Sequence, residues 1–193
     1  SVPGAPWARI PIEKQIGYKR EQVIDLFRKF AKTNIAPFLD EVIASPVTWN
    51  YRNKMEFSFG FSGEEKVDQH WRHFGFALGS KKRGQFWLVE NLETPSGLFD
   101  ESFESFVPIL RKFCEHTGLQ PFNQKTQKGF WRHMVVRKSF YQDKFLINMV
   151  TSSQFEPLFR DSTEKIMQQV ADLLKQAFGC LLYTSDAADD ETS

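Results

Sequence analysis

Apolar and polar residues alternate along residues 50–61, "NYRNKMEFSFGF". The odd positions from Met55 to Phe61 are all apolar, whereas the even positions between them carry Glu, Ser or Gly. A period of two residues is typical of a strand with one face in the core. The same pattern, or a short apolar run, predicts strands at about 51–61, 73–79, 85–90, 130–138 and 144–150.

The strand expected at 73–79, "HFGFALG", has Phe74, Phe76 and Leu78 on one face, and the other face carries the small residues Gly75, Ala77 and Gly79. Small residues such as Gly79 allow another part of the chain to approach the backbone closely. The following segment "GSKKRG", at 79–84, has the length and the glycines of a hairpin loop. We therefore expect the second and third strands to form a hairpin.

A helical period predicts three helices, at about 11–32, 98–118 and 162–178. In the second helix, Pro108 predicts a kink or a helix start near Ser105, because proline lacks a backbone N–H. Gly118 suits the end of that helix. Asp161 and Glu164 have the spacing of a capping box at the start of the third.

The predicted order is helix, three strands, helix, two strands, helix. This order indicates an α+β fold with a mainly antiparallel sheet and flanking helices. Residues 33–49 form a connector punctuated by prolines. No internal repeat interrupts the pattern, so we expect one domain over residues 1–179.

The composition changes abruptly after Gly179. The last fourteen residues, 180–193, hold four of the 24 acidic residues and none of the 25 lysines and arginines. The segment "CLLYTSDAADD" resembles translated adapter sequence, so we expect a non-native tail and a natural protein that continues past residue 179. The alternative is a native, solvated acidic tail.

The formal charge of the whole chain, +1, conceals a basic body. Without the acidic tail, which contributes four negative charges, the remaining chain carries a formal charge of +5. The basic residues are also clustered, as shown below. A basic body suits a polyanionic partner.

The sequence contains none of the common enzyme motifs. It has no Gly-rich phosphate loop and no G-x-S-x-G turn. Its four histidines do not have metal-ligand spacing. Cys114 and Cys180 form neither a disulfide framework nor a metal pattern, which indicates a reducing, cytoplasmic compartment, and Cys114 is expected to be buried. No apolar run approaches the ~20 residues of a membrane span, so no membrane partner is expected.

Cationic and aromatic residues recur together in three segments, at 51–54, 70–84 and 125–138. Cations at sheet ends and in loops can neutralise phosphates, and aromatic rings can stack on unpaired bases. The combination favours recognition of single-stranded or looped RNA. For any one segment, the alternative is a set of cations on a solvated face and rings in the core. The candidate RNA contacts are Arg52, Asn53, Lys54, Lys81, Lys82, Arg83, Arg132, His133 and Arg137.

The first segment carries more detailed expectations. Arg52 and Lys54 should share a face of the strand and contact phosphate, while Met55 and Phe57 anchor the strand in the core. Asn53 either contacts RNA or forms a hydrogen bond with the backbone at the start of the strand.

The residues of these segments also resemble a known family. "SPVTWNYRNKMEFSFG" is similar to the central domain of the S-adenosylmethionine-dependent tRNA/rRNA uracil-C5 methyltransferases. "GFWRHMVVRKS" resembles the family's G-x-[LW]-[RK]-x-[LM]-x-[VI]-R strand, and "PWARIPIEKQIGYKREQV" resembles the helix after its cysteine-rich segment. "FRDSTEKIMQQVADLLKQAFG" lies where the family leads into its methyltransferase domain. The resemblance covers most of residues 7–179.

This resemblance implies the RNA-recognition domain of an RNA (uracil-C5) methyltransferase. The full-length protein would transfer a methyl group from S-adenosylmethionine to C5 of a uridine, in rRNA (23S) rather than in tRNA. The family's cofactor loop, nucleophilic cysteine and general base would lie after residue 179. The resemblance therefore implies no catalytic and no cofactor-binding residue in this chain, which alone should be inactive.

Many family members carry an iron–sulfur cluster, and its later cysteine should fall within "LVENLETPS", at Leu92. A leucine cannot replace a thiolate ligand, so we expect no iron–sulfur cluster and no other metal in this chain. Two alternatives to the methyltransferase interpretation are a stand-alone RNA-binding module and a protein-interaction domain with an aromatic docking surface.

Overall fold

The computed structural model describes residues 5–82, 84–152, 160–179 and 181–186. The chain divides into two compact units, one up to Tyr51 and the other from Arg52 onward. All the predicted strands and all the candidate RNA contacts belong to the second unit. Within the described residues, no helix is both long and apolar enough to cross a membrane.

The first unit is built on the helix α1 (Ile12–Ala31), which confirms the helix predicted at 11–32. A short 3-10 helix, η1 (Ala36–Phe38), follows it. The guanidinium of Arg20 donates hydrogen bonds to the carbonyl groups of Ala36 and Leu39 and so ties this connector to α1. Ile24 is the buried residue of α1, whereas other apolar residues of the helix, such as Phe27 and Phe30, are exposed.

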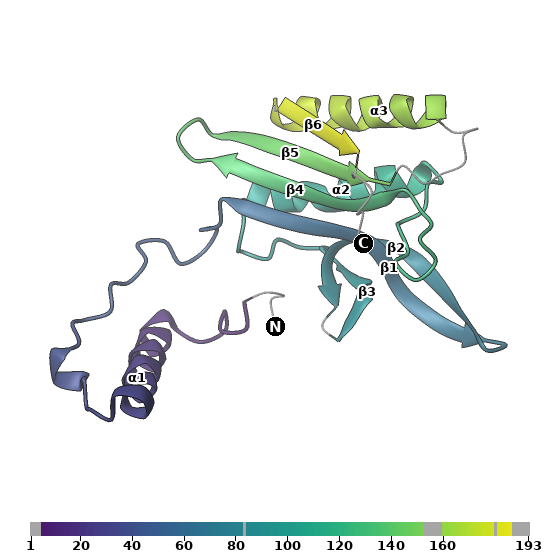
Figure 1. Ribbon diagram of the computed structural model, residues 1–193. Helices are drawn as coiled ribbons and strands as arrows, with labels where there is room; N and C mark the ends of the chain where they lie inside the picture. Colours follow the sequence, from purple (N-terminus) through teal and green to yellow (C-terminus); the bar gives the residue numbers. More distant parts are fainter. Residues whose placement is uncertain (1–4, 83, 153–159, 180, 187–193) are drawn as a thin grey trace. The chain divides into compact units, whose positions relative to one another are not determined.

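The second unit contains a six-stranded sheet with the order β2-β3-β1-β4-β5-β6, in which β2 also pairs with β1 (Figure 1). Its strands are β1 (Lys54–Val67), β2 (His70–Lys82), β3 (Gln85–Asn91), β4 (Trp131–Ser139), β5 (Lys144–Thr151) and β6 (Leu181–Asp186). Four strand pairs are antiparallel, but β1–β3 and β5–β6 are parallel. The α+β prediction is confirmed, and the sheet is mixed.

Strand β6 was not predicted, because it lies in the segment expected to be a non-native tail. Its backbone pairs in parallel with β5, from Leu146 with Leu181 to Thr151 with Asp186. This pairing does not decide where the segment comes from, so its non-native origin stays a prediction.

The hairpin of β1 and β2 is longer than its sequence pattern indicated. The two strands remain paired out to Val67 and His70, and a two-residue turn at Asp68 and Gln69 joins them. Both turn residues have positive φ, +48° and +65°, as in the turns that match the twist of paired strands. The outer part of the hairpin is mostly exposed, so it lacks the apolar alternation that reveals a strand.

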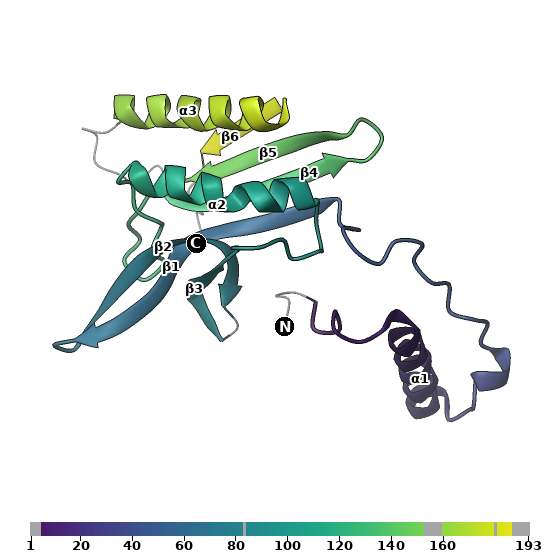
Figure 2. The same ribbon diagram turned by 180° about the vertical axis from the view of Figure 1, so that it is seen from behind.

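Two helices, α2 (Glu101–His116) and α3 (Arg160–Phe178), complete the unit. The ring of Phe103 on α2 packs against Phe57 of β1 and Phe145 of β5. Phe178 of α3 packs against both Phe103 and Phe145. Both helices therefore bury the same face of the sheet, and α2 crosses in front of it when the molecule is seen from behind (Figure 2).

The start of α2 differs from the prediction. Asp100 caps the helix by accepting a hydrogen bond from the Phe103 backbone N–H, so the helix begins well before Ser105 and contains Pro108. The side chain of Asp100 therefore marks the start of the helix, which the sequence pattern placed nearer to Pro108 as one alternative. Gly118, with φ +77°, follows the last helical turn as expected.

The start of α3 and the surroundings of Gly79 can also be compared with their predictions. Helix α3 begins at Arg160, two residues before its predicted start, and the side chain of Asp161, the expected cap, lies outside the described residues. Gly79 is a point of close approach, as predicted, because a Cβ there would collide with the carbonyl oxygen of Glu90 on β3.

Candidate nucleic-acid interface

The side chains of β4 alternate between two different environments. Met134 and Val136 are fully buried beneath the helices. His133, Val135 and Arg137 point to the other face, where they lie opposite Ser58, Glu56 and Lys54 of β1. We call the face formed by these six residues the open face.

The open face places two cations directly opposite each other. Lys54 pairs in register with Arg137, and both side chains are exposed. Within the described residues, neither side chain has a hydrogen bond or an ion pair. Like charges at directly opposite positions destabilise a sheet. An anion bound between them would remove that repulsion.

A β-bulge changes the direction of the side chains at the start of β4. The register with β5 shifts between Trp131 and His133. Trp131 turns into the core, where its ring stacks on Phe59 with the centroids 5.3 Å apart. Arg132 and His133 both line a pocket on the opposite side. Bulges commonly redirect side chains in this way next to functional sites.

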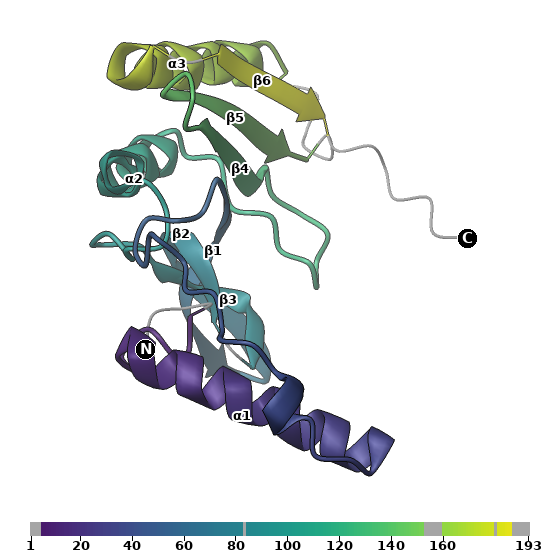
Figure 3. The same cartoon turned by 90° about the vertical axis from the view of Figure 1, so that its left-hand side faces the viewer.

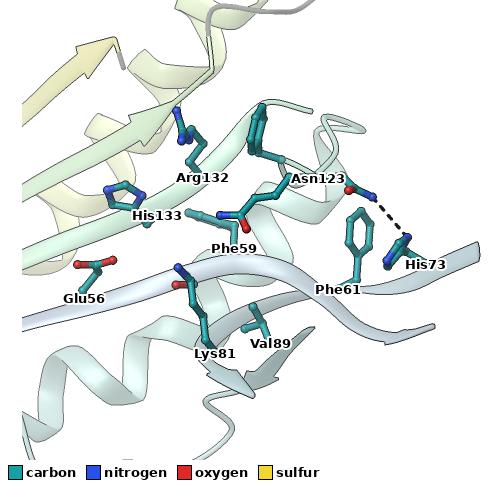
Figure 4. Close-up of a pocket in the computed structure, with 12 residues that line it drawn as sticks. Glu56, Phe59, Phe61, His73, Lys81, Val89, Asn123, Arg132 and His133 are labelled. Atoms are coloured by element: carbon teal, nitrogen blue, oxygen red, sulfur yellow. Dashed lines mark hydrogen bonds between the residues drawn. The ribbon is translucent and has the colours of Figure 1, made fainter. Parts of the chain in front are cut away.

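The pocket lies where β1, β2 and β4 meet the loop at 120–130 (Figure 4). Its volume is about 170 Å³. Its basic side chains, Lys81 and Arg132, outnumber Glu56, its one acid. The lining residues are Glu56, Ser58, Phe59, Phe61, His73, Lys81, Val89, Phe122, Asn123, Gln124, Arg132 and His133.

The pKa of His133 depends on its burial and on the charges around it. Burial is the main cause that lowers the pKa of His133. The positive charges of Arg132 and Lys81 lower this pKa further, and the carboxylate of Glu56 opposes them. The imidazole is therefore neutral over more of the pH range than an ordinary histidine. An anion in the pocket would favour its protonated form.

The loop at 120–130 is held against the sheet by its own hydrogen bonds. The Asn123 N–H donates to the Lys128 carbonyl at 2.7 Å, and the Phe122 N–H donates to the Trp131 carbonyl at 2.8 Å. Gly129 has φ +119°, and a Cβ there would collide with the Pro121 carbonyl group. Seen from the side, this loop and α2 lie on opposite sides of the sheet (Figure 3).

The structure brings together five of the predicted RNA contacts. Lys54 and Arg137 lie at one end of the open face, and the other three residues line the pocket at its other end. The five residues are Lys54, Lys81, Arg132, His133 and Arg137.

The remaining predicted contacts lie elsewhere. The Arg52 guanidinium is 3.6 Å from the sulfur of the buried Met55, and the expectation that Arg52 and Lys54 share a face stays a prediction. The Asn53 carbonyl accepts a hydrogen bond from the Lys138 backbone N–H. Lys82 follows an irregularity in the pairing of β2 with β3, and Arg83 lies outside the described residues.

Aromatic rings in the third cationic segment have a structural role. Phe130 and Trp131 are buried in the core, so neither can stack on a base. Met55 and Phe57 are also buried, as expected for residues that anchor the strand. Phe122, Asn123 and His73 were missed as site residues, because only the folded loop and hairpin bring them to the pocket. The turn-forming composition of "FNQKTQKG" is the one signal that could have indicated such a loop.

The described residues contain neither a candidate metal site nor an activated thiol. They contain no group of three or more His, Cys, Asp or Glu side chains that could hold a metal ion. Cys114 is fully buried, as predicted, and burial raises the pKa of its thiol. A thiol of this kind is not an activated nucleophile.

Comparison with known proteins places these features in context. No family model matches the sequence. An uncharacterized RNA methyltransferase of Chlorobaculum tepidum is 30% identical over 171 residues, which cover 86% of this chain and 35% of that protein. Another, of Caldanaerobacter subterraneus, is 30% identical over 161 residues, covering 83% of this chain and 33% of that protein. These likenesses support an RNA methyltransferase family.

A third relative, from Thermotoga maritima and also called an uncharacterized RNA methyltransferase, is 26% identical over 166 residues, covering 86% of this chain and 34% of that protein. The chain thus spans about a third of the length of the curated relatives it matches.

A solved structure shares the fold. The crystal structure of Pyrococcus abyssi tRNA (uracil-54, C5)-methyltransferase in complex with S-adenosyl-L-homocysteine matches with a TM-score of 0.58 and 19% sequence identity. The match covers 95% of this chain and 36% of that chain.

Proposed function

We propose that the chain is the RNA-recognition part of an S-adenosylmethionine-dependent RNA (uracil-C5) methyltransferase. The observation that carries this proposal is the set of cations on and beside the open face. Lys54 and Arg137 repel each other across two strands, and the basic pocket lies further along the same strands. The family likeness supplies the reaction class.

The cations suit the phosphates of an RNA backbone. Phosphate contacts position a nucleic acid, and their number determines how steeply affinity falls with salt. On a strand, the four residue steps from Lys54 to Ser58 span about 13 Å. The Lys54–Arg137 pair and the pocket at His133 therefore offer two separate points of contact along one backbone.

The methyl donor would be held by another part of the full-length protein. The pocket is basic, whereas S-adenosylmethionine carries a positively charged sulfonium group, and like charges disfavour binding. The sequence also lacks a Gly-rich turn between a strand and a helix. The described residues thus do not fit the cofactor. In our proposal, this chain holds and orients the RNA and performs no step of the methyl transfer.

The substrate is proposed to be ribosomal RNA, 23S rRNA, because the overall sequence pattern is closer to the ribosomal members of the family. The Pyrococcus abyssi enzyme of similar fold is a tRNA methyltransferase by its name. Both kinds of RNA therefore belong in the test.

The decisive experiment uses the intact gene. Its full-length product should transfer labelled methyl groups from S-adenosylmethionine to C5 of a uridine in a 23S rRNA transcript, and more slowly or not at all in tRNA. The 193-residue chain alone should bind the same transcript and transfer none. A gene that encodes no methyltransferase domain, or a full-length product that methylates neither RNA, would contradict the proposal in favour of a stand-alone RNA-binding module.

A further inference from the structure

We propose that the pocket between β1, β2, β4 and the loop at 120–130 is a subsite for one unpaired nucleobase of the bound RNA. This inference rests on the proposed function and adds to it. The open face supplies phosphate contacts, which carry no information about the base, whereas a pocket that encloses a base selects unpaired RNA.

The size and lining of the pocket suit a planar ring. Its volume of about 170 Å³ is an order of magnitude more than one buried water requires. The rings of Phe61 and Phe122 form part of its wall, and the Arg132 guanidinium lies 4.7 Å from the centre of the Phe122 ring. Aromatic and guanidinium surfaces of this kind stack on unpaired bases.

Polar groups that match the edge of a base line the same pocket. The Asn123 Oδ1 accepts hydrogen bonds from the Lys125 and Thr126 backbone N–H groups, which fixes the orientation of its amide. Its Nδ2 then faces Nδ1 of His73 at 3.4 Å (Figure 4). A carboxamide offers donors and acceptors that can read a base. Gln124, the next residue, adds an exposed carboxamide at the rim.

The hydrogen bond from Asn123 also fixes the tautomer of His73. Because the amide nitrogen can only donate, Nδ1 of His73 must accept, so the proton of the neutral ring is on Nε2. Nε2 lies 3.2 Å from Oε2 of Glu64, and the two side chains are only 10% and 9% exposed. This buried pair holds the His73 ring beside Phe61, with the two ring centroids 5.1 Å apart.

The buried pair of His73 and Glu64 lacks some of its hydrogen bonds. Within the described part of the chain, neither His73 Nε2 nor Glu64 Oε2 has a well-aligned hydrogen-bond partner. Buried polar atoms without a well-aligned partner are costly, so this pair holds His73 in place at some expense. His73 lines the pocket with its ring, while its Nδ1 accepts from Asn123 and its buried Nε2 faces Glu64.

Cations on the other side of the pocket suit the phosphate of the same nucleotide. Lys81, Arg132 and His133 lie close enough for the two side-chain charges to influence the pKa of the histidine. An acidic peptide could also contact these cations. The side chains of an acidic peptide would not stack on the aromatic wall or need the fixed amide of Asn123. The complete set of groups therefore favours a nucleotide.

The test compares two oligomers of equal length and charge, hexauridylate and a six-unit abasic ribose-phosphate chain, bound to the 193-residue protein. The wild-type chain should bind hexauridylate about 5- to 150-fold more tightly, the range that stacking of a base on protein rings supplies. Phe122→Ala should remove most of that preference and leave the affinity for the abasic chain unchanged. Gln124→Ala, at an exposed position, should reduce the preference in the same direction with little effect on folding.

Arg137→Ala is the matched control, because Arg137 lies on the open face outside the pocket lining. It should weaken binding of both oligomers equally. If wild type and Phe122→Ala show no preference while Arg137→Ala still weakens both, the subsite is disproved and the RNA-binding role stands. If neither oligomer binds, the RNA-binding role fails as well. If hexaglutamate binds as tightly as hexauridylate and Phe122→Ala weakens it, the pocket is a peptide site instead.

Discussion

Arg137 and Lys138 are neighbours on β4 with the same charge, but they have opposite surroundings. The Lys138 ammonium forms ion pairs with Asp100 and Asp143, and its side chain is only 15% exposed. Arg137 is exposed, faces Lys54 across the strands, and has no ion pair among the described residues. Lys138 is thus part of the fold, whereas Arg137 is available to a ligand.

The helix cap explains why Lys138 is held so firmly. Asp100 caps α2 and accepts hydrogen bonds from Lys138, Ser102 and the Phe103 backbone. Burial alone would raise the pKa of Asp100, but these hydrogen bonds and the Lys138 charge together lower it. The hydrogen bond to Asp100 likewise raises the pKa of Lys138. Each group therefore stabilises the charged form of the other.

The largest expected effect follows from breaking this pair. Asp100→Ala removes the cap, about 1 kcal/mol, and a hydrogen bond to a charged group, about 1.5 kcal/mol or more. We expect the free energy of unfolding to fall by about 2–3 kcal/mol in urea denaturation. Because the folded-state pKa of Asp100 is lowered, its stabilisation is present above the ordinary carboxyl pKa and is lost as the pH falls through the folded-state value.

Asp100→Asn serves as the control, since asparagine caps a helix as well as aspartate does. This variant should recover the part of the loss that belongs to the cap and should remove the acid dependence. Both variants should bind RNA normally where they are folded. A specific loss of RNA affinity by folded Asp100→Asn would show that the two cations are not separate in function.

A smaller effect concerns His133, whose pKa is lowered by burial and by Arg132 and Lys81, with Glu56 opposing. A bound phosphate favours the protonated ring, so binding takes up a proton and RNA affinity should rise as the pH falls from 7 toward 5.5. The free chain should lose stability over the same range, because its unfolded state binds that proton more readily. Fluorescence titrations at several pH values measure the first effect.

His133→Gln should flatten this pH dependence. His116→Gln, at an exposed position on α2, removes a histidine away from the open face and should leave it intact. An unchanged pH profile in His133→Gln would exclude His133 as the source.

The smallest effect tests the repulsion on the open face. Lys54→Glu places opposite charges at facing positions, which should stabilise the sheet by about 0.2–1 kcal/mol in thermal unfolding. The same change should weaken RNA binding, because it replaces a phosphate contact by a negative charge. Lys54→Ala should fall between wild type and Lys54→Glu in stability. Stabilisation without any loss of RNA affinity would contradict the proposed role of the pair.

Some of this arrangement could be predicted from the sequence, and some could not. The alternation from Met55 to Phe61 predicted both the strand and its buried face, because burial of one face leaves a periodic signal. It predicted neither the outer hairpin, which lacks a buried face, nor the contact of Arg52, which precedes the strand, with the sulfur of Met55.

The candidate site shows the same division. Basic composition identified Arg132 and Arg137, but only the register of β1 with β4 shows that Arg137 faces Lys54. The partner of Lys138, Asp100, is 38 residues away along the chain. The loop that carries Phe122 and Asn123 reaches the pocket through backbone hydrogen bonds, which are independent of side-chain identity and therefore leave little trace in the sequence.

The central claim, that the unpaired cations bind an RNA backbone, is tested most directly by the salt dependence of binding. Affinity for a uridine-containing RNA loop is measured at several salt concentrations for wild type, for Arg132→Ala/Arg137→Ala, and for Lys112→Ala as a charge-matched control on α2. Each phosphate contact to single-stranded RNA contributes about 0.7 to the slope of log affinity against log salt. We predict that the double variant binds more weakly and that its slope is shallower by about 1.4, while Lys112→Ala matches wild type. An unchanged affinity and slope in the double variant would contradict the account.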